Sequence, residues 1–256
     1  MGEDSRSPRS AGSTKMKFSA VILSLLFGAN LVFAADPANA ILDIRFRVLG
    51  WDLEVSDLFY ETGGKVRPLL VPNGVRSAFY KYKGPCILVF FRMKKDEKGN
   101  VVRVPAASLD LAPCGKWPLI LFTKNGNKQP PEYTLRAIPD DLDSFPASTY
   151  EFFNMTRVPV TVRLADDTFT LGAQELKQSK VTLSGGKTTV YASVIYNGPK
   201  GPVRVYGNNW ACNPTERTLV FVREDPQTPS GAAARRVIES AIFPPEPLPA
   251  TGGIPQ

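Results

Sequence analysis

A two-residue alternation of apolar and polar side chains recurs along this chain and limits what it can fold into. In residues 42–48, Leu42, Ile44, Phe46 and Val48 alternate with Asp43, Arg45 and Arg47. The same pattern returns at residues 158–164, 189–194 and 203–205. Successive side chains of a β-strand point to opposite faces of a sheet, so the alternation predicts strands with one buried face and one wet face.

Two continuous apolar runs, residues 86–91 and 119–122, predict strands that are buried on both faces. Pairs of turn-forming residues separate the strand candidates. These pairs are Gly63-Gly64, Asn73-Gly74, Gly99-Asn100, Asn125-Gly126, Gly185-Gly186, Asn197-Gly198 and Gly207-Asn208. No window of a dozen residues before position 230 shows a helical stripe, and the 23 prolines disfavour long helices. The chain is therefore predicted to be all-β.

Two similar halves organise the strand pattern. The first runs through Pro72, residues 79–82, Pro85, Leu111, Gly115 and residues 117–122; the second runs through Pro146, residues 150–153, Pro159, Leu183, Gly186 and residues 190–195. We interpret them as two immunoglobulin-like antiparallel β-sandwich modules in tandem, at 41–124 and 132–223, with a linker near 124–131. Residues 224–256 are predicted to be a Pro-rich tail, largely extended or disordered, with a short helix or extended segment at 232–242.

The N-terminus has the layout of a secretory signal peptide. Lys15 and Lys17 precede an uncharged, mainly apolar run at residues 18–33 that ends in small residues. We expect residues 1–34 to be a leader and signal peptide that is cleaved between Ala34 and Ala35, with cleavage after Ala40 as an alternative. An uncleaved anchor is the other alternative, because residues 18–35 just reach spanning length. Met16, which Lys17 follows, is the expected start of translation, and Met1 is the alternative.

The charge pattern does not favour nucleic-acid binding. The formal net charge is +7, and removal of residues 1–34 leaves about +5. The adjacent basic pairs, Lys94-Lys95 and Arg235-Arg236, lie beside acidic residues, which indicates solvated loops and no nucleic-acid interface. An anionic glycan or an envelope protein stays open as the partner, and the sequence gives no oligomeric state. Residues 248–252 match LPxTG, but no apolar span and basic tail follow them, so we interpret the match as coincidence.

The chain contains no histidine, which excludes His-dependent triads and His-ligated metals. No phosphate-binding or dinucleotide-binding glycine motif occurs either, and we expect no cofactor and no metal. Carboxylates remain, at Asp140, Asp141 and Asp143 and at Asp166-Asp167. Such clusters hydrolyse glycosides or bind calcium in some proteins, but Asp is also a favoured turn residue, and we give the turn interpretation more weight.

Three cysteines in an oxidising compartment permit one disulfide and one free thiol. Cys86 and Cys114 lie in the same predicted module, which makes them the better pair, whereas Cys212 lies in the other. No CxxC spacing supports a zinc or redox site.

Aromatic side chains near Asn208 suggest a ligand-contact site. Tyr206, Asn208 and Trp210 would suit sugar binding if the rings were exposed, and Tyr80, Tyr82 and Tyr191 are further candidates. The alternative is that each ring fills a sandwich core, and it carries more weight. Asn154 begins a formal glycosylation sequon within or beside a predicted strand.

Three segments carry a resemblance to other proteins: the signal peptide, residues 145–154 (FPASTYEFFN) and residues 217–222 (RTLVFV). Through them the chain resembles uncharacterised exported bacterial proteins with tandem β-sandwich modules. That resemblance implies no known activity and no site residues. We therefore predict an exported, non-catalytic binding or scaffolding protein of the periplasm, cell envelope or extracellular space. A periplasmic assembly factor similar to the two-domain pilus chaperones and a carboxylate-dependent glycan hydrolase are the alternatives.

Overall fold

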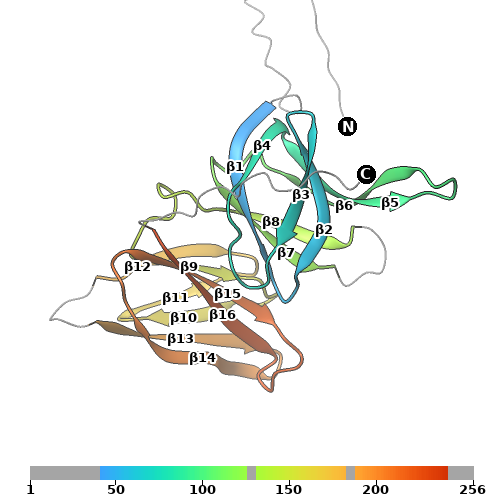
Figure 1. Ribbon diagram of the computed structural model, residues 1–256. Coiled ribbons are helices and arrows are strands. Elements are labelled where there is room, and N and C mark those ends of the chain that lie inside the picture. Colours follow the sequence, from blue (N-terminus) through green and yellow to red (C-terminus); the bar gives the residue numbers. More distant parts are fainter. Residues whose placement is uncertain (1–40, 126–130, 183–187, 242–256) are drawn as a thin grey trace, which may run out of the picture. The chain divides into compact units, whose positions relative to one another are not determined.

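A computed structural model describes residues 41–125, 131–182 and 188–241, and every regular element in these ranges is a β-strand (Figure 1). The first eight strands are β1 (Ile41–Gly50), β2 (Val55–Thr62), β3 (Lys65–Val71), β4 (Tyr80–Pro85), β5 (Ile87–Lys95), β6 (Val101–Asp110), β7 (Pro118–Lys124) and β8 (Tyr133–Pro139). The next eight are β9 (Thr149–Asn154), β10 (Val160–Leu164), β11 (Asp167–Leu171), β12 (Leu176–Lys180), β13 (Thr189–Gly198), β14 (Gly201–Ala211), β15 (Glu216–Glu224) and β16 (Ala232–Ser240).

The first module consists of two four-stranded sheets, in the orders β4-β1-β7-β8 and β3-β2-β5-β6. Apolar side chains from both sheets meet in its core, among them Phe46, Leu58, Tyr82, Phe90 and Ile120. The ring of Phe46 contacts three other aromatic rings, those of Tyr60, Tyr80 and Phe90. The alternation at residues 42–48 thus places Phe46 and Val48 inside this sandwich, as a strand of period two requires.

The second module repeats this arrangement with the sheets β12-β9-β15-β16 and β11-β10-β13-β14. Its core holds Phe152, Val162, Val194, Trp210 and Val220. In each module the first strand pairs antiparallel with the fourth and parallel with the seventh, and the second strand lies between the third and the fifth.

The identical strand order supports the predicted duplication, but it corrects the residue correspondence. Residues 79–82 lie in the fourth strand of the first module, whereas residues 150–153 lie in the first strand of the second. By topology β7 corresponds to β15, so residues 119–122 correspond to 219–222. Strand order identifies equivalent strands because it depends only on the position of each strand within its module. The spacing of prolines and aromatic residues depends on loop length and therefore does not identify them.

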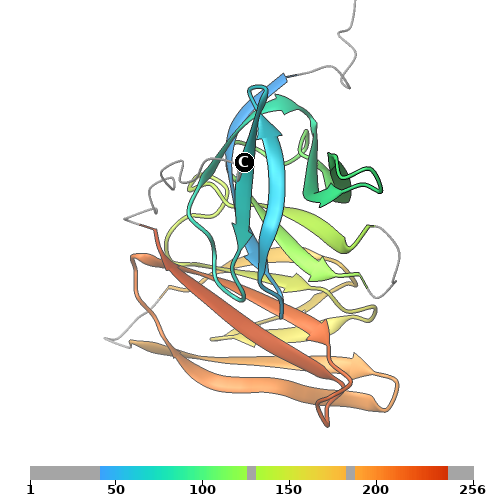
Figure 2. The same ribbon diagram turned by 45° about the vertical axis from the view of Figure 1, so that its right-hand side comes forward.

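A third apolar cluster lies between the modules. It contains Leu49, Leu119 and Leu121 from the first module and Leu219 and Phe221 from the second, together with Trp51, Ile138, Phe145, Phe153 and Val237. The facing sheets are β4-β1-β7-β8 and β12-β9-β15-β16, which meet in Figure 2. Residues 119–122 alternate between this cluster and the first core, which confirms that they are buried on both faces.

The all-β fold of two β-sandwich modules is confirmed, with a difference in strand direction. The pairs β1–β7 and β9–β15 are parallel, so the sheets that face one another are mixed and not purely antiparallel. The linker predicted at 124–131 lies between β7 and β8, which are paired neighbours in one sheet. The sheets of the first module therefore continue to Pro139, and those of the second begin at Thr149.

Two further segments differ from their predictions. Residues 232–240, expected to be a short helix or part of an extended tail, form β16, which pairs with β15 over nine residues. Residues 86–91, expected to be buried on both faces, are only partly so, because Ile87 and Val89 are exposed, whereas Leu88, Phe90 and Phe91 are buried. Within the described ranges there is no helix with the length and apolarity that a bilayer crossing requires.

Candidate functional site

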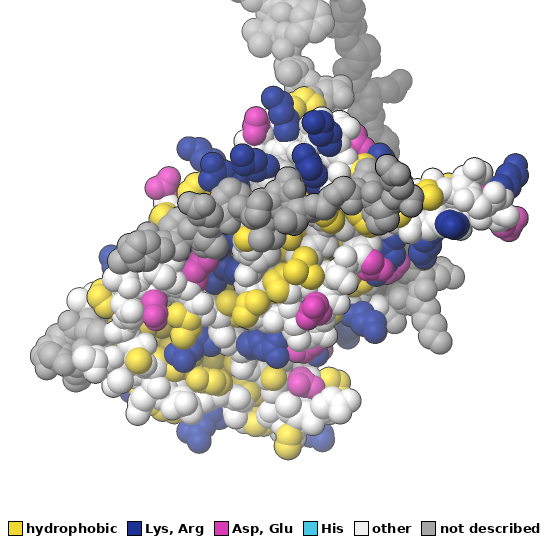
Figure 3. All heavy atoms as spheres, in the orientation of Figure 1, with side chains coloured by type: hydrophobic (Ala, Val, Ile, Leu, Met, Phe, Trp, Pro, Cys, Tyr) yellow, Lys and Arg dark blue, Asp and Glu magenta, His cyan; other side chains and the backbone are white. Residues whose placement is uncertain are grey.

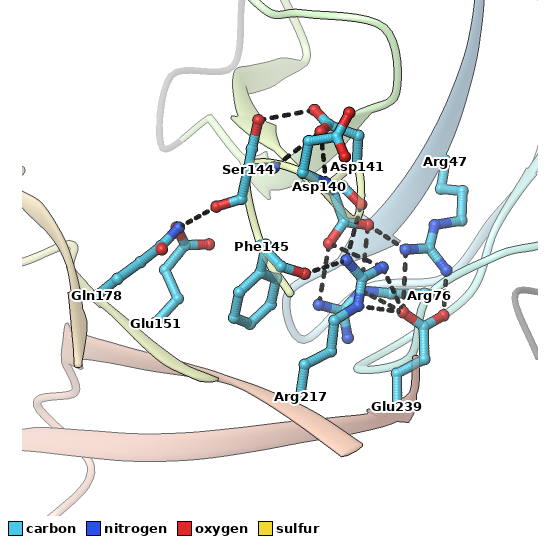
Figure 4. A network of polar contacts seen from close by, with 11 residues as sticks. Arg47, Arg76, Asp140, Asp141, Ser144, Phe145, Glu151, Gln178, Arg217 and Glu239 are labelled. Carbon is cyan, nitrogen blue, oxygen red and sulfur yellow. Dashed lines mark hydrogen bonds and ion pairs between the residues drawn. The ribbon is translucent and has the colours of Figure 1, made fainter. Parts of the chain in front are cut away.

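A buried network of three arginines and two carboxylates lies between the modules (Figure 4). Arg47 comes from β1, Arg76 from the segment between β3 and β4, and Asp140 from the residue after β8. Arg217 and Glu239 come from β15 and β16 of the second module. Figure 4 shows the three guanidinium groups turned toward the two carboxylates.

Strand periodicity explains why these side chains meet. Arg47 shares a face of β1 with Leu49, which lies in the cluster between the modules, and Arg217 shares a face of β15 with Leu219. Glu239 likewise shares a face of β16 with Val237. The network therefore occupies the same layer as the third apolar cluster.

Arg47 bridges the two carboxylates. One of its terminal nitrogens donates to Asp140 and the other to Glu239, and the former also lies 3.0 Å from Oε2 of Glu239. The Arg47 side chain is only 1% exposed. Burial lowers its pKa, but the charges and hydrogen-bond acceptors of Asp140 and Glu239 outweigh burial and raise that pKa above the usual arginine value.

Arg76 forms a two-point contact with Asp140. Its Nη2 lies 3.1 Å from Oδ1 and its Nε lies 3.3 Å from Oδ2. The fork geometry of arginine suits such paired donation to a carboxylate. Arg76 and Asp140 are 4% and 1% exposed in their side chains, so the pair is removed from solvent.

Arg217 connects the network to the backbone of the segment between the two modules, residues 140–148. Its Nη1 donates to the carbonyl oxygens of Asp140 and Phe145, each at 2.9 Å. Its Nε and Nη2 lie 3.0 Å and 2.7 Å from Oε2 of Glu239, and its guanidinium carbon lies 5.1 Å from the centre of the Phe145 ring. Burial raises the pKa of Glu239, but hydrogen bonding and charge from the arginines prevail and hold it below its usual value.

Glu151 is a buried acid beside the network. Its Oε1 accepts a hydrogen bond from Gln178 at 2.8 Å, and its Oε2 has no hydrogen-bond partner among the described residues. Burial raises the pKa of Glu151 to about 7; the Gln178 hydrogen bond and the charges of Arg76 and Arg217 oppose this rise, and the charge of Asp140 adds to it. Nη1 of Arg76 and Nε of Arg47 also lack a hydrogen-bond partner in the described part of the chain.

The predicted acidic cluster is divided among three environments. Asp140 lies in the network, whereas Asp141 caps the following turn by accepting the backbone N–H groups of Asp143 and Ser144 at 3.1 and 2.8 Å. Burial raises the pKa of Asp141, but these hydrogen bonds and that of the Ser144 hydroxyl lower it below its usual value. Asp143 is exposed. The contacts of Asp141 match the turn interpretation, whereas the Asp140 carboxylate pairs with three arginines, Arg47, Arg76 and Arg217.

Asp166 and Asp167 lie elsewhere, at the exposed turn between β10 and β11. No group of three or more Asp, Glu or Cys side chains within the described ranges is arranged to hold a metal ion. The structure therefore does not bring the two predicted acidic clusters together.

Cys86 and Cys114 are both buried in the first module and lie beside the same turn. The backbone N–H of Leu111 donates to the carbonyl of Cys86 at 2.9 Å, and that of Cys114 donates to the carbonyl of Leu111 at 3.1 Å. Burial raises the pKa of the Cys114 thiol, with a further contribution from Asp110. Cys212 lies in the second module, where its sulfur is 3.0 Å from the Tyr150 hydroxyl. The Cys86–Cys114 disulfide stays a prediction.

The three suggested ligand-contact residues do not form one exposed surface. Trp210 is 1% exposed, and its ring stacks on Tyr150 and Phe152 in the second core. Its Nε1 donates to the Tyr206 hydroxyl at 2.7 Å, while Asn208 is exposed. Tyr80 and Tyr82 are also buried, and Tyr191 is 37% exposed.

Two further sequence predictions concern the glycosylation sequon at Asn154 and the two ends of the chain. Asn154 is fully buried, and its amide nitrogen donates to the carbonyl oxygens of Val158 and Gly172 at 2.8 Å, so the folded chain does not present this sequon. The cleavage site between Ala34 and Ala35, and residues 242–256, lie outside the described residues.

Sequence reasoning missed Arg47, Arg76, Arg217 and Glu239 as site residues. Arg47 was expected on a wet strand face, but the second module covers that face. One usable signal is the position of Arg217 at the start of RTLVFV, because a charged residue in a strand buried on both faces requires a partner.

No protein-family model matches the sequence, and no curated protein matches it either. Among solved structures, the chain is similar to the pair of C2 domains of Extended-Synaptotagmin 2, at 10% sequence identity and a TM-score of 0.23. The match covers 88% of this chain and 99% of that chain. A likeness at this level carries no statement about activity, and the fold assignment rests on the strand pairing described above.

Proposed function

We propose that this chain is an exported protein of the cell envelope that acts by binding or scaffolding and not by catalysis. The observation that carries the proposal is the interface between the modules, where an apolar cluster and a buried ionic network join two sandwiches. Such an interface favours one fixed arrangement of the modules, because separating them would expose the apolar faces to solvent and break the ion pair between Arg47 and Glu239.

The fate of the acidic residues favours binding over hydrolysis. A glycosidase requires two carboxyl groups on either side of the scissile bond, whereas Asp140 is paired with Arg47 and Arg76, and Asp141 is engaged in a turn. The pattern at residues 15–35 supports export, and the partner we propose is an envelope protein.

The proposal is tested by expressing the complete chain in a bacterium, fractionating the cells and identifying proteins that co-purify with it. We expect the chain in the envelope or periplasmic fraction, with a mass that corresponds to cleavage between Ala34 and Ala35, and a specific co-purifying envelope protein. Retention in the cytoplasm would contradict export. Release of soluble sugar from envelope glycan that disappears in Asp141→Asn would contradict the non-catalytic role.

A further inference from the structure

A groove of about 390 Å³ opens on the first module between the β2–β3 turn, the end of β4 and the first half of β5. Gly63 and Gly64 line it from the turn, Lys83 and Pro85 from β4, and Ile87 from β5. Val89, Phe91, Arg103 and Pro105 also contribute to its lining. None of these residues belongs to the network between the modules.

The groove exists because β2 and β5 separate. They pair at only two positions, Phe59 with Phe91 and Tyr60 with Phe90. Beyond Tyr60, the end of β2 turns toward β4 instead, where Gly63 N–H donates to the Lys83 carbonyl at 2.8 Å. Among the described residues, Ile87–Val89 of β5 therefore have no partner on the β2 side of the strand.

The floor of the groove is apolar although it faces solvent. Ile87 and Val89 are 58% and 38% exposed and point away from the first core, which contains Leu88 between them. Side chains two residues apart on one strand lie roughly 7 Å apart, the spacing of alternate side chains in any extended peptide. Exposed apolar side chains in a concave surface are typical of a binding site.

The surroundings of the groove are basic. Lys83, Arg103 and one acid, Glu61, line it, and exposed Arg45, Lys65 and Lys81 lie on the neighbouring strands β1, β3 and β4. In Figure 3, Lys and Arg side chains gather over the end of the first module that carries β1, β3 and β4. Asp43 and Glu61 offset part of this charge, since they pair with Lys83 and Arg103. The remaining positive charge favours an acidic partner.

We propose that this groove binds an extended peptide segment of another protein, with apolar side chains at alternate positions and acidic side chains between them. The apolar side chains pack on Ile87 and Val89, and the acidic ones point away from this floor, where the positive charges of Lys83 and Arg103 attract them at longer range. This inference rests on the proposed binding function and names the class of partner.

The test uses the mature protein and two fluorescein-labelled synthetic peptides, one alternating valine with glutamate and the other alternating valine with lysine. Fluorescence anisotropy at low salt measures their dissociation constants. We expect the glutamate peptide to bind at least about tenfold more tightly, and its affinity to fall as salt screens the basic rim.

Matched variants locate the binding. Val89→Asp places a like charge on the groove floor and should weaken the glutamate peptide at least about tenfold. Val101→Asp is the control, because Val101 is 64% exposed on β6 and does not line the groove. Lys83→Glu should weaken binding about fivefold, whereas Lys200→Glu, an exposed lysine at the turn between β13 and β14 of the second module and outside the lining, should leave it unchanged. Circular dichroism confirms that each variant is folded.

Equal affinities of the two peptides, or equal effects of Val89→Asp and Val101→Asp, would overturn the inference. A wild-type dimer that Val89→Asp dissociates would show that a second copy occupies the groove. Tighter peptide binding after deletion of residues 242–256 would show that the chain's own segment occupies it. Each of these two results also overturns the proposal of a separate partner. If Val89→Asp leaves capture of the envelope partner unchanged, the groove proposal fails while the proposed function stands.

Discussion

Arg47 of β1 and Glu239 of β16 are 192 residues apart in sequence and form a buried ion pair that joins the two modules. Both side chains lie in the layer of the apolar cluster between the sandwiches. A pair in this position couples the folding of the two modules, because separating them breaks the contact between Arg47 and Glu239 and leaves only the partners next to or within each module, Asp140 for Arg47 and Arg217 for Glu239.

Arg47→Met is therefore expected to destabilise the whole chain by about 3–5 kcal/mol, because it leaves Asp140 and Glu239 with less compensation in a buried site. Urea unfolding followed by tryptophan fluorescence measures the change. Arg157→Met is the control, since Arg157 is 90% exposed and its contact with Glu224 spans 4.0 Å. That control should change stability by at most about 1 kcal/mol. Equal losses in the two variants would argue against the structural importance of the network.

Stability should depend on pH in two opposite ways. The folded-state pKa of Glu239 is lowered, so its contribution is present above its usual value of 4.5 and is lost as pH falls through the folded pKa. The pKa of Glu151 is raised to about 7, so between pH 4.5 and 7 the folded chain holds a proton that the unfolded chain has released. Stability should then fall as pH rises through this window, by at most about 1.4 kcal/mol per pH unit.

Glu151→Gln separates these two contributions. The variant keeps a side chain of similar shape and cannot ionise, so the loss of stability between pH 4.5 and 7 should largely disappear. The loss of stability at lower pH, which comes from Glu239, should remain. Asp140, Arg76 and Arg217 face this group and are unchanged in the variant. Urea midpoints collected across roughly pH 4 to 8 provide the comparison, and an identical slope in both proteins would show that Glu151 does not cause it.

The Cys86–Cys114 disulfide predicts a thiol count that depends on the compartment of expression. Protein exported to an oxidising compartment should show one reactive thiol after denaturation, that of Cys212, whereas cytoplasmic protein should show three. Closing this loop is expected to contribute about 3–4 kcal/mol by chain entropy. A thiol assay in denaturant with and without reductant measures the count. Three reactive thiols in the exported protein would refute the bond.

Trp210 is expected to act through core packing and not through ligand contact. Trp210→Ala should cost about 3–5 kcal/mol, because it removes a fully buried ring that packs on Tyr150 and Phe152. Tyr191→Ala, on the adjacent strand and 37% exposed, should cost at most about 1 kcal/mol. Thermal unfolding of both variants provides the comparison. A stable Trp210→Ala protein with reduced glycan binding would restore the ligand-contact hypothesis.

Local sequence patterns predicted the fold class because they record which side chains face a core. The alternation at residues 42–48 correctly placed Phe46 and Val48 inside a sandwich, and the run at residues 119–122 correctly indicated burial on both faces. The same alternation misplaced Arg47, because a two-residue period cannot distinguish a face covered by water from a face covered by another sheet. Arg45, on the same face, is indeed exposed, since it lies nearer the start of β1.

The network was beyond sequence reasoning because its members are distant in the chain. Arg76, Asp140 and Glu239 have no shared motif or spacing, and only the stacking of two sheets brings them together. The groove was missed for a related reason. The apolar run at residues 86–91 indicated full burial, and the separation of β2 from β5 that exposes Ile87 and Val89 depends on how the β2–β3 turn meets β4.

The interface between the modules uses equivalent surfaces. Leu119 and Leu121 of β7 face it from one side, and Leu219 and Phe221 of β15, the corresponding strand, face it from the other. Two copies related by a twofold axis in a symmetric dimer meet in this way, each offering the same patch to the other. In this respect the contact between the modules resembles an interface between two identical subunits.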